Sequence, residues 1–123
     1  MNKEFVSYEH AVALKELGFD EECFSFFEDV DVLYNSEGTY KYNDNVWEES
    51  EVIAPLKQQV FRWFREKYGV YPTIMTEIED DSLYFRFIAE GGPEWLSFSK
   101  IYYTYEEAEN ACIDKLIELA KQS

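Results

Sequence analysis

Two groups of carboxylates are the residues of this chain whose spacing could support chemistry. The groups are Glu77, Glu79, Asp80 and Asp81, and Asp29 with Asp31. Neighbouring carboxylates can hold a hard cation, or can act as an acid and a base in hydrolysis. Acidic turns are, however, far more often solvated loops, and we interpret both groups in that way. We predict neither a metal ion nor any other cofactor.

Histidine and cysteine, the other frequent catalytic and metal-binding residues, are scarce. His10 is the only histidine, and its position in the first turn of a predicted helix favours a partly exposed structural role. Cys23 and Cys112 lie far apart and outside any CxxC or Cys/His spacing, which predicts two reduced, buried thiols. The sequence also lacks a glycine-rich phosphate loop and the GxSxG and HExxH motifs. We therefore predict that the protein is not an enzyme.

The chain is strongly acidic, with 26 acidic and 11 basic residues and a formal net charge of -15. Such a surface repels phosphate backbones and anionic membranes, so neither direct nucleic-acid binding nor membrane binding is expected. The charge agrees with simple solubility or with a basic protein partner. No apolar run approaches the roughly 20 residues that span a bilayer, and the amino terminus does not resemble a signal peptide. A cytoplasmic location is expected.

Aromatic residues make up 19% of the chain, with ten Phe, ten Tyr and three Trp. This is more than the core of one small domain comfortably buries, so some tyrosine and tryptophan side chains are expected at the surface. Two interpretations remain open. Half-exposed tyrosines on strands would explain the number, and so would a binding surface, because aromatic residues are enriched at interface hot spots.

The best-marked element is a helix predicted over residues 55–69. Pro55 suits its first position, and Gly69 suits the position after its last residue. Its apolar side chains at helical spacing are Leu56, Val60, Phe61, Trp63, Phe64 and Tyr68. A shorter helix is predicted from an N-cap at Ser7 to about residue 17. A last helix begins with a capping box, in which Thr104 is the cap and Glu107 its partner.

Short strands are predicted on both sides of the central helix. Before it they cover residues 23–27, 30–34 and 39–42, with a turn at 35–38 between the last two. A polar connection follows, and we expect Trp47 to anchor it to the core. After the helix, alternating side chains predict strands over residues 70–79, 83–89 and 95–103, separated by a turn at 80–82 and a break at 91–93.

The central helix lies in a small basic region of an otherwise acidic chain. Residues 55–76 carry four basic residues and one acidic residue. Lys57, Arg62 and Arg65 could form a basic patch. We favour internal charge balance with neighbouring carboxylates over a binding role.

The order α-β-β-β-α predicted from Pro55 to Leu119 resembles the topology of a double-stranded RNA-binding domain. That family binds A-form RNA by its shape, through backbone and 2′-hydroxyl contacts. Its lysine-rich cluster at the start of the last helix has no counterpart here, because residues 103–107 read Tyr-Thr-Tyr-Glu-Glu. The resemblance therefore implies the fold without RNA binding, and leaves the sheet for contact with a protein.

Three further runs are similar to small uncharacterised proteins of phages and integrated elements of gut bacteria. These runs are residues 8–20, 61–69 and 105–109. That family has no established activity, so no residue role can be transferred from it. The resemblance implies only a genetic setting, an accessory protein that acts on host machinery.

These observations predict one α+β domain over residues 1–123. Its first part, residues 1–54, is a short helix with a β-hairpin region. Its second part, residues 55–123, is an α-β-β-β-α unit whose helices pack on one face of an antiparallel sheet. The opposite sheet face is the expected exposed surface. Its candidate binding residues are Tyr84, Arg86, Ile88, Tyr102 and Tyr103.

The predicted function is non-catalytic binding of a protein partner or of a second copy of the chain. One alternative is mimicry of nucleic acid, in which exposed carboxylates occupy the basic channel of a host nucleic-acid-binding or defence protein. Mimicry requires a continuous track of acidic residues. Another alternative is weak nucleic-acid binding through Lys57, Arg62 and Arg65.

Overall fold

The computed structural model of the chain describes residues 2–30, 32–42, 47–91 and 96–122. These residues fall into two compact units, Met1–Lys57 and Gln58–Ser123. Each unit combines helix with an antiparallel sheet, which confirms the predicted α+β class. The predicted division lay between residues 54 and 55, whereas the structure divides the chain between Lys57 and Gln58. That the two units together form one domain stays a prediction.

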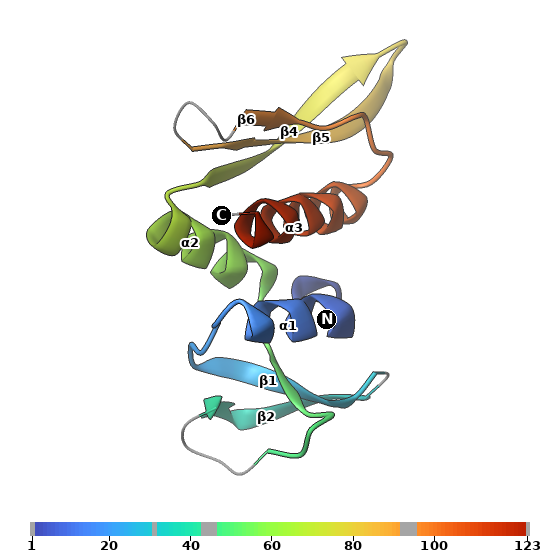
Figure 1. Cartoon of the computed structure of the whole chain (residues 1–123). Coiled ribbons are helices and arrows are strands. Elements are labelled where there is room, and N and C mark those ends of the chain that lie inside the picture. The colour runs from blue at the N-terminus through green and yellow to red at the C-terminus, as the bar shows by residue number, and fades with distance from the viewer. Residues whose placement is uncertain (1, 31, 43–46, 92–95, 123) are drawn as a thin grey trace. The chain divides into compact units, whose positions relative to one another are not determined.

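The first unit is a three-stranded sheet with a helix on one face (Figure 1). Its elements are η1 (Asn2–Glu4), α1 (Tyr8–Glu16), β1 (Cys23–Asp29), β2 (Val32–Tyr40) and β3 (Val52–Ala54), with strand order β2-β1-β3. Ser7 is the N-cap of α1, as predicted, and its hydroxyl accepts a hydrogen bond from the His10 backbone N–H at 3.1 Å. His10 itself is 9% exposed, so its predicted partial exposure is wrong.

Residues 30–42 differ from the prediction of two strands joined by a turn. A single strand, β2, covers residues 32–40 and runs through the turn-rich residues 35–38. The pairing with β1 shifts there, from Ser25 opposite Asn35 to Cys23 opposite Tyr40. A bulge of this kind absorbs the extra residues without ending the strand. Strand β3 was not predicted from the sequence. This strand has only three residues, and all of them are buried, so it shows no alternation of apolar and polar side chains.

The second unit has the predicted α-β-β-β-α order. Its elements are α2 (Lys57–Tyr68), β4 (Tyr71–Glu79), β5 (Ser82–Glu90), β6 (Leu96–Phe98) and α3 (Tyr105–Lys121). The sheet is antiparallel with strand order β4-β5-β6, and both helices lie on the same side of it (Figure 1). Fully buried side chains from these elements include Val60, Phe64, Ala89, Cys112 and Leu116. They form the core on the helix side of the sheet.

The two long helices begin and end largely as predicted. In α3 the Glu107 backbone N–H donates to Thr104 Oγ1 at 3.1 Å, and the Thr104 hydroxyl donates to Glu107 Oε1 at 3.0 Å. Gly69 follows α2 with φ +68°, the left-handed conformation expected there. The start of α2 is wrong by two residues: the Pro55 carbonyl accepts a hydrogen bond from Val6 N–H and Leu56 bridges Phe5, so both residues belong to the first unit.

The third strand of the second unit is shorter than predicted, since β6 ends at Phe98. A separate β-bridge pairs Tyr102 with Phe85 farther along the same edge. Residues 92–95, which include most of the predicted Gly-Gly-Pro break and Trp95, lie outside the described residues. Asp31 of the smaller acidic pair also lies outside them.

The turn between β4 and β5 is a tight two-residue connection. Glu79 pairs with Ser82, which leaves Asp80 and Asp81 as the central residues, with φ of 51° and 64°. Positive φ at both central positions defines the type I′ turn that matches the twist of a β-hairpin. Aspartate tolerates this conformation less well than Asn followed by Gly does.

We therefore expect the double substitution Asp80→Asn with Asp81→Gly to raise the free energy of unfolding by about 1 kcal/mol. The measurement is the midpoint of urea unfolding. The control is Asp20→Asn with Glu49→Gln, which removes two exposed charges elsewhere. Equal stabilisation by both variants would show that relief of charge repulsion, and not turn geometry, is responsible.

Candidate functional site

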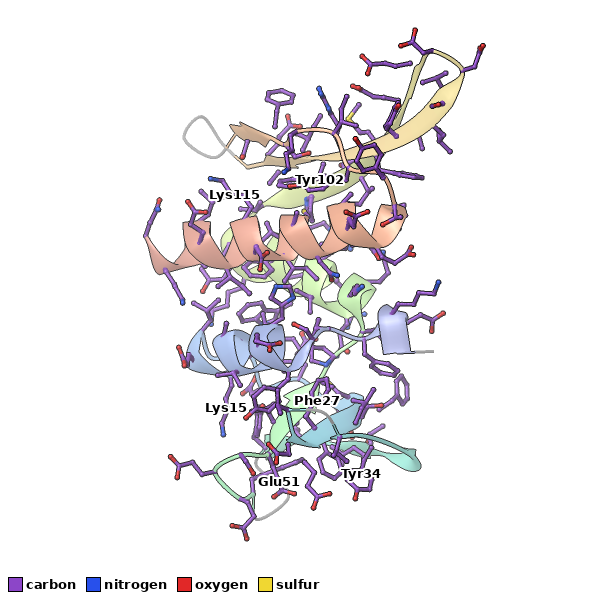
Figure 2. The ribbon with its side chains drawn as sticks, turned by 90° about the vertical axis from the view of Figure 1, so that its right-hand side faces the viewer. Lys15, Phe27, Tyr34, Glu51, Tyr102 and Lys115 are labelled. Carbon is purple, nitrogen blue, oxygen red and sulfur yellow. The ribbon has the colours of Figure 1, made fainter. Side chains whose placement is uncertain are left out.

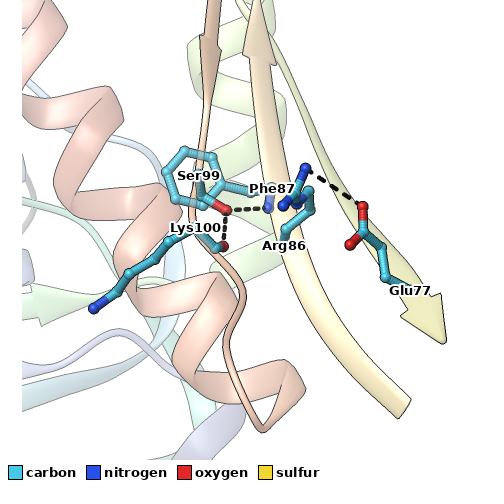
Figure 3. A network of polar contacts seen from close by, with 5 residues as sticks. All are labelled: Glu77, Arg86, Phe87, Ser99 and Lys100. Atoms are coloured by element: carbon cyan, nitrogen blue, oxygen red, sulfur yellow. Dashed lines mark hydrogen bonds and ion pairs between the residues drawn. The ribbon is translucent and has the colours of Figure 1, made fainter. Parts of the chain in front are cut away.

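The second sheet has one face that neither α2 nor α3 covers. Side chains alternate across a strand, so Phe87, which is 4% exposed, marks the helix side and Arg86 the opposite side. Figure 3 shows Arg86 and Glu77 on the side turned away from α3. We call this side the open face. By alternation and pairing its residues are Tyr71, Thr73, Met75, Glu77, Glu79, Ser82, Tyr84, Arg86, Ile88, Glu90 and Phe98.

The open face carries large side chains in contact with solvent. Tyr71 is 57% exposed and Phe98 is 60% exposed. Tyr103, 76% exposed, joins this side because its ring lies 5.7 Å from that of Tyr84. Isolated exposed apolar residues are ordinary, but a gathering of aromatic rings on one sheet face marks a candidate interaction site.

An ion pair lies among these apolar and aromatic side chains. Arg86 Nη1 is 3.4 Å from Glu77 Oε1, and the two side chains are 30% and 31% exposed (Figure 3). Arg86 Nε is buried and has no hydrogen-bond partner among the described residues. A partner's acceptor could not reach this buried nitrogen, but the Arg86 side chain as a whole is 30% exposed and is already held beside Glu77. Contact with its exposed part would therefore cost little in further ordering of the arginine side chain.

Ser99 lets the chain leave the edge of the sheet without losing a hydrogen bond. The Phe87 backbone N–H donates to Ser99 Oγ at 2.8 Å, and the Ser99 hydroxyl donates to the Lys100 carbonyl oxygen at 2.7 Å (Figure 3). The Ser99 backbone N–H donates to the Phe87 carbonyl at 3.0 Å. The chain then returns to the sheet at Tyr102, whose backbone pairs with Phe85.

The structure brings together four of the five predicted surface residues. Tyr84, Arg86 and Ile88 share the open face by alternation, and Tyr103 joins them through its ring contact with Tyr84. Tyr102 differs, because paired residues share a face and its partner Phe85 belongs to the helix side. Sequence reasoning missed Tyr71 and Phe98. The alternation of β4 could have assigned Tyr71, whereas the face of Phe98 follows only from the register that pairs it with Ile88.

The predicted basic patch on α2 is not assembled as one exposed surface. Lys57 is 4% exposed and does not contribute to it. Arg62 Nε lies 3.8 Å from Glu66 Oε1, one helical turn away. Arg65 is half-buried. Pairing of this kind between exposed residues contributes little stability, but it agrees with internal charge balance.

The first unit has an aromatic cluster of its own, centred on Phe26. The Phe26 ring stacks on Tyr34 at 5.2 Å and contacts Tyr40 at 4.7 Å and Trp47 at 5.4 Å. Trp47 thus contacts the strands, as expected for an anchor of its loop. Figure 2 shows Tyr34 on the side of the sheet opposite α1. The rings of this cluster mostly cover one another, which makes it a poorer candidate site than the open face.

Two tyrosines of the first unit have raised pKa values for different reasons. Burial raises the pKa of Tyr42 to about 12, although the hydrogen bond that its hydroxyl accepts from Ile53 N–H at 2.8 Å acts in the opposite direction. The hydrogen bond with Glu28, with the charge of that carboxylate, raises the pKa of Tyr34. Neither tyrosine is poised to lose its proton near neutral pH.

The described residues form no metal-binding cluster, no disulfide and no membrane-spanning helix. No group of three or more His, Cys, Asp or Glu side chains there is placed to hold a metal ion. Neither Cys23 nor Cys112 forms a disulfide, and both are buried. Burial, with a smaller effect from Glu109, raises the pKa of the Cys112 thiol to about 12. Within the described part of the chain, no helix combines the length and the apolar character needed to cross a bilayer.

Comparison with known proteins adds no relative to this description. The sequence matches no protein-family model, and neither the curated proteins nor the solved structures gave a significant match. The resemblances to double-stranded RNA-binding domains and to small phage proteins therefore stay predictions. The function must be argued from the surface itself.

Proposed function

We propose that this protein is a non-catalytic binding module that contacts a partner protein through the open face. The observation that carries the proposal is the concentration of exposed aromatic side chains on the one sheet face that α2 and α3 leave uncovered. Tyrosine and arginine are the residue types most often found at interface hot spots, and this face presents three tyrosines and Arg86.

The layout of the open face supports a protein partner in two ways. Tyr71, Phe98 and Tyr103 supply apolar area that is rigid, because each side chain has only two rotatable bonds to order. The Arg86–Glu77 pair supplies a partly exposed polar centre. A complementary surface would bury the rings and offer a carbonyl or carboxylate to Arg86. If the chain is a phage or integrated-element protein, as the sequence analysis predicts, the partner is a bacterial host protein in the cytoplasm.

The test is affinity capture from a bacterial lysate with three immobilised baits. The first bait is the wild-type chain, and the second carries Phe98→Ser with Tyr103→Ser, two exposed sites whose change spares the core. The third carries Phe24→Ser, a matched exposed phenylalanine of the first unit, which is 55% exposed. We expect at least one protein to be retained by the first and third baits and depleted about tenfold on the second.

Self-association is measured on the same three proteins by sedimentation velocity. A wild-type dimer that the Phe98→Ser, Tyr103→Ser variant abolishes would identify a second copy as the partner. Equal capture by all three baits, together with a monomeric wild-type chain, would contradict the proposal. Nucleic-acid mimicry stays a separate prediction, which a partner eluted by salt and unaffected by Phe98 and Tyr103 would favour.

A further inference from the structure

The end of the β4–β5 hairpin continues the apolar row of the helix side beyond the helices that cover it. Phe87 on this row is 4% exposed, whereas Ile78 and Leu83 are 76% and 53% exposed. Ile78 and Leu83 are direct cross-strand partners on the same side as Phe85 and Phe87. Figure 1 shows this end of the hairpin projecting past α3. We call residues 77–84 the hairpin end.

The start of α3 lies against the base of the hairpin end. The Tyr105 ring packs edge-to-face on Phe85 at 5.9 Å, and the Phe85 backbone pairs with Tyr102. Beyond Phe85 the two strands stay paired as far as Glu79 and Ser82. The apolar pair is therefore held on a regular two-stranded ribbon with a tight turn. Such a ribbon loses little conformational freedom when a partner binds it.

Negative charge surrounds this exposed apolar pair. The hairpin end contains Glu77, Glu79, Asp80 and Asp81 and no basic residue. Glu77 pairs with Arg86 on the open face, and alternation places Glu79 on that face too. Asp80 and Asp81, the central residues of the turn, are exposed at the tip beside Ile78 and Leu83. Exposed Glu107 adds a further charge from the first turn of α3. The surface thus combines two uncovered aliphatic side chains with several carboxylates from two adjoining elements.

The exposed aliphatic pair and the carboxylates around it together determine what kind of molecule could bind the hairpin end. A second copy of the chain would bring its own acidic hairpin end and a net charge of -15, so electrostatic repulsion opposes self-association here. Nucleic acids and anionic membranes are repelled for the same reason. Apolar burial alone would be weak with two side chains. Opposite charge on the occupant would add attraction and speed association.

We infer that the hairpin end docks a basic amphipathic segment of a partner protein, whose apolar side chains cover Ile78 and Leu83 while Lys or Arg side chains meet Asp80, Asp81 and Glu107. This surface is separate from the open face, since Ile78 and Leu83 lie on the opposite side of the sheet. It extends the proposed binding function to a second contact of defined chemistry, and its test does not depend on the open face.

The probe is a fluorescein-labelled peptide of about 18 residues of Leu and Lys, arranged so that the leucines share one face of a helix. Two further peptides serve as comparisons: one has the same composition in scrambled order, and one has Glu in place of Lys. Binding to the full chain is followed by fluorescence anisotropy at low and at moderate salt. The binding site is mapped from amide chemical-shift changes in NMR spectra of the full chain.

The Leu/Lys peptide is expected to bind more tightly than both comparison peptides, with shift changes concentrated at residues 77–84 and 105–107. Ile78→Ser with Leu83→Ser should weaken binding about tenfold. Asp80→Asn with Asp81→Asn should weaken it severalfold at low salt and make it less sensitive to salt. Both asparagines suit the positive φ of the turn, so this variant is expected to fold.

Matched variants separate a specific site from general attraction to an acidic protein. Asp20→Asn with Glu49→Gln removes two exposed charges from the first unit and should change the affinity less than twofold. Phe98→Ser with Tyr103→Ser alters the open face and should leave peptide binding unchanged, whatever it does to partner capture. Equal weakening by the two charge-removing variants, shift changes away from the hairpin end, or no binding at millimolar peptide would each overturn the inference.

Discussion

Replacing Gly91 with alanine is expected to lower the free energy of unfolding by about 3 kcal/mol, the largest effect of any glycine substitution proposed for this chain. A Cβ at residue 91 would lie 2.5 Å from the Gly69 carbonyl oxygen and 2.9 Å from Val70 Cα. Both obstacles are backbone atoms, in the segment that connects α2 to β4. Neither can rotate away as a side chain would, so the end of β5 and this segment must separate.

Two other glycines are matched controls for the Gly91→Ala prediction. At Gly69 an added Cβ has open space, but φ is +68°, so alanine there should cost about 1 kcal/mol through backbone strain alone. At Gly38 an added Cβ also has open space, and alanine should be close to neutral. Urea unfolding of the three alanine variants should show a loss of stability that increases in the order Gly38, Gly69, Gly91. A loss of stability at Gly91 no larger than at Gly69 would contradict the close approach of Gly91 to the Gly69 and Val70 backbone.

Local signals in the sequence were enough to predict the elements of the second unit. The capping box at Thr104 and Glu107, the helix-ending Gly69 and the alternation along β4 and β5 each depend on residues near one another in the chain. The same alternation assigned Tyr84, Arg86 and Ile88 to one face of the sheet. These predictions succeed because the cause and its effect lie within a few residues.

The features that prediction missed depend on residues far apart in the chain. Pro55 has the local features of a helix start. The Val6 backbone N–H, however, donates a hydrogen bond to the Pro55 carbonyl, and the helix begins two residues later. Residues 35–38 have the composition of a turn, yet they lie within β2, between the pairs that Asn35 and Tyr40 form with β1. The neighbours Tyr102 and Tyr103 were both predicted to lie on one face, although side chains alternate along the strand predicted there. Ser99 interrupts that strand, and the chain returns with Tyr102 opposite Phe85.

Exposure of the hairpin end could not be foreseen from alternation either. The pattern predicts that Ile78 and Leu83 share a face with Phe85 and Phe87, and it would count all four as core. Whether a residue on that face is covered depends on how far the helices extend over the sheet. In the structure Phe87 is 4% exposed and Ile78 is 76% exposed on the same side. The candidate second contact thus arises from a mismatch between the lengths of the hairpin and the helix layer.

Stability is expected to fall steeply in alkali because of Cys112, by roughly 2 kcal/mol between pH 9 and pH 11. Desolvation is the main cause that raises the pKa of this buried thiol from 9.0 to about 12, and Glu109 adds a smaller effect. Below pH 9 the thiol is protonated in both the folded and the unfolded chain, so it makes no difference to stability. Above pH 9 the unfolded chain loses the proton while the folded chain keeps it. Unfolding is therefore favoured progressively until about pH 12, where the folded thiol also ionises.

Urea unfolding at pH 8 and pH 11 under reducing conditions measures this loss, and Cys112→Ala isolates the thiol. Alanine leaves a small cavity that lowers stability at both pH values, but it removes a titrating group, so the difference between pH 8 and pH 11 should shrink by roughly 2 kcal/mol. Ile113→Val, at the next buried residue of α3, is the matched control. It should cost about 1 kcal/mol at both pH values and keep the full alkaline loss.

Tyr42, whose pKa burial raises to about 12, contributes a parallel loss in every variant and cancels from the comparison. An alkaline loss as large in Cys112→Ala as in the wild type would mean that the thiol is ionised within the fold well below pH 12, and that the core around α3 is open to water.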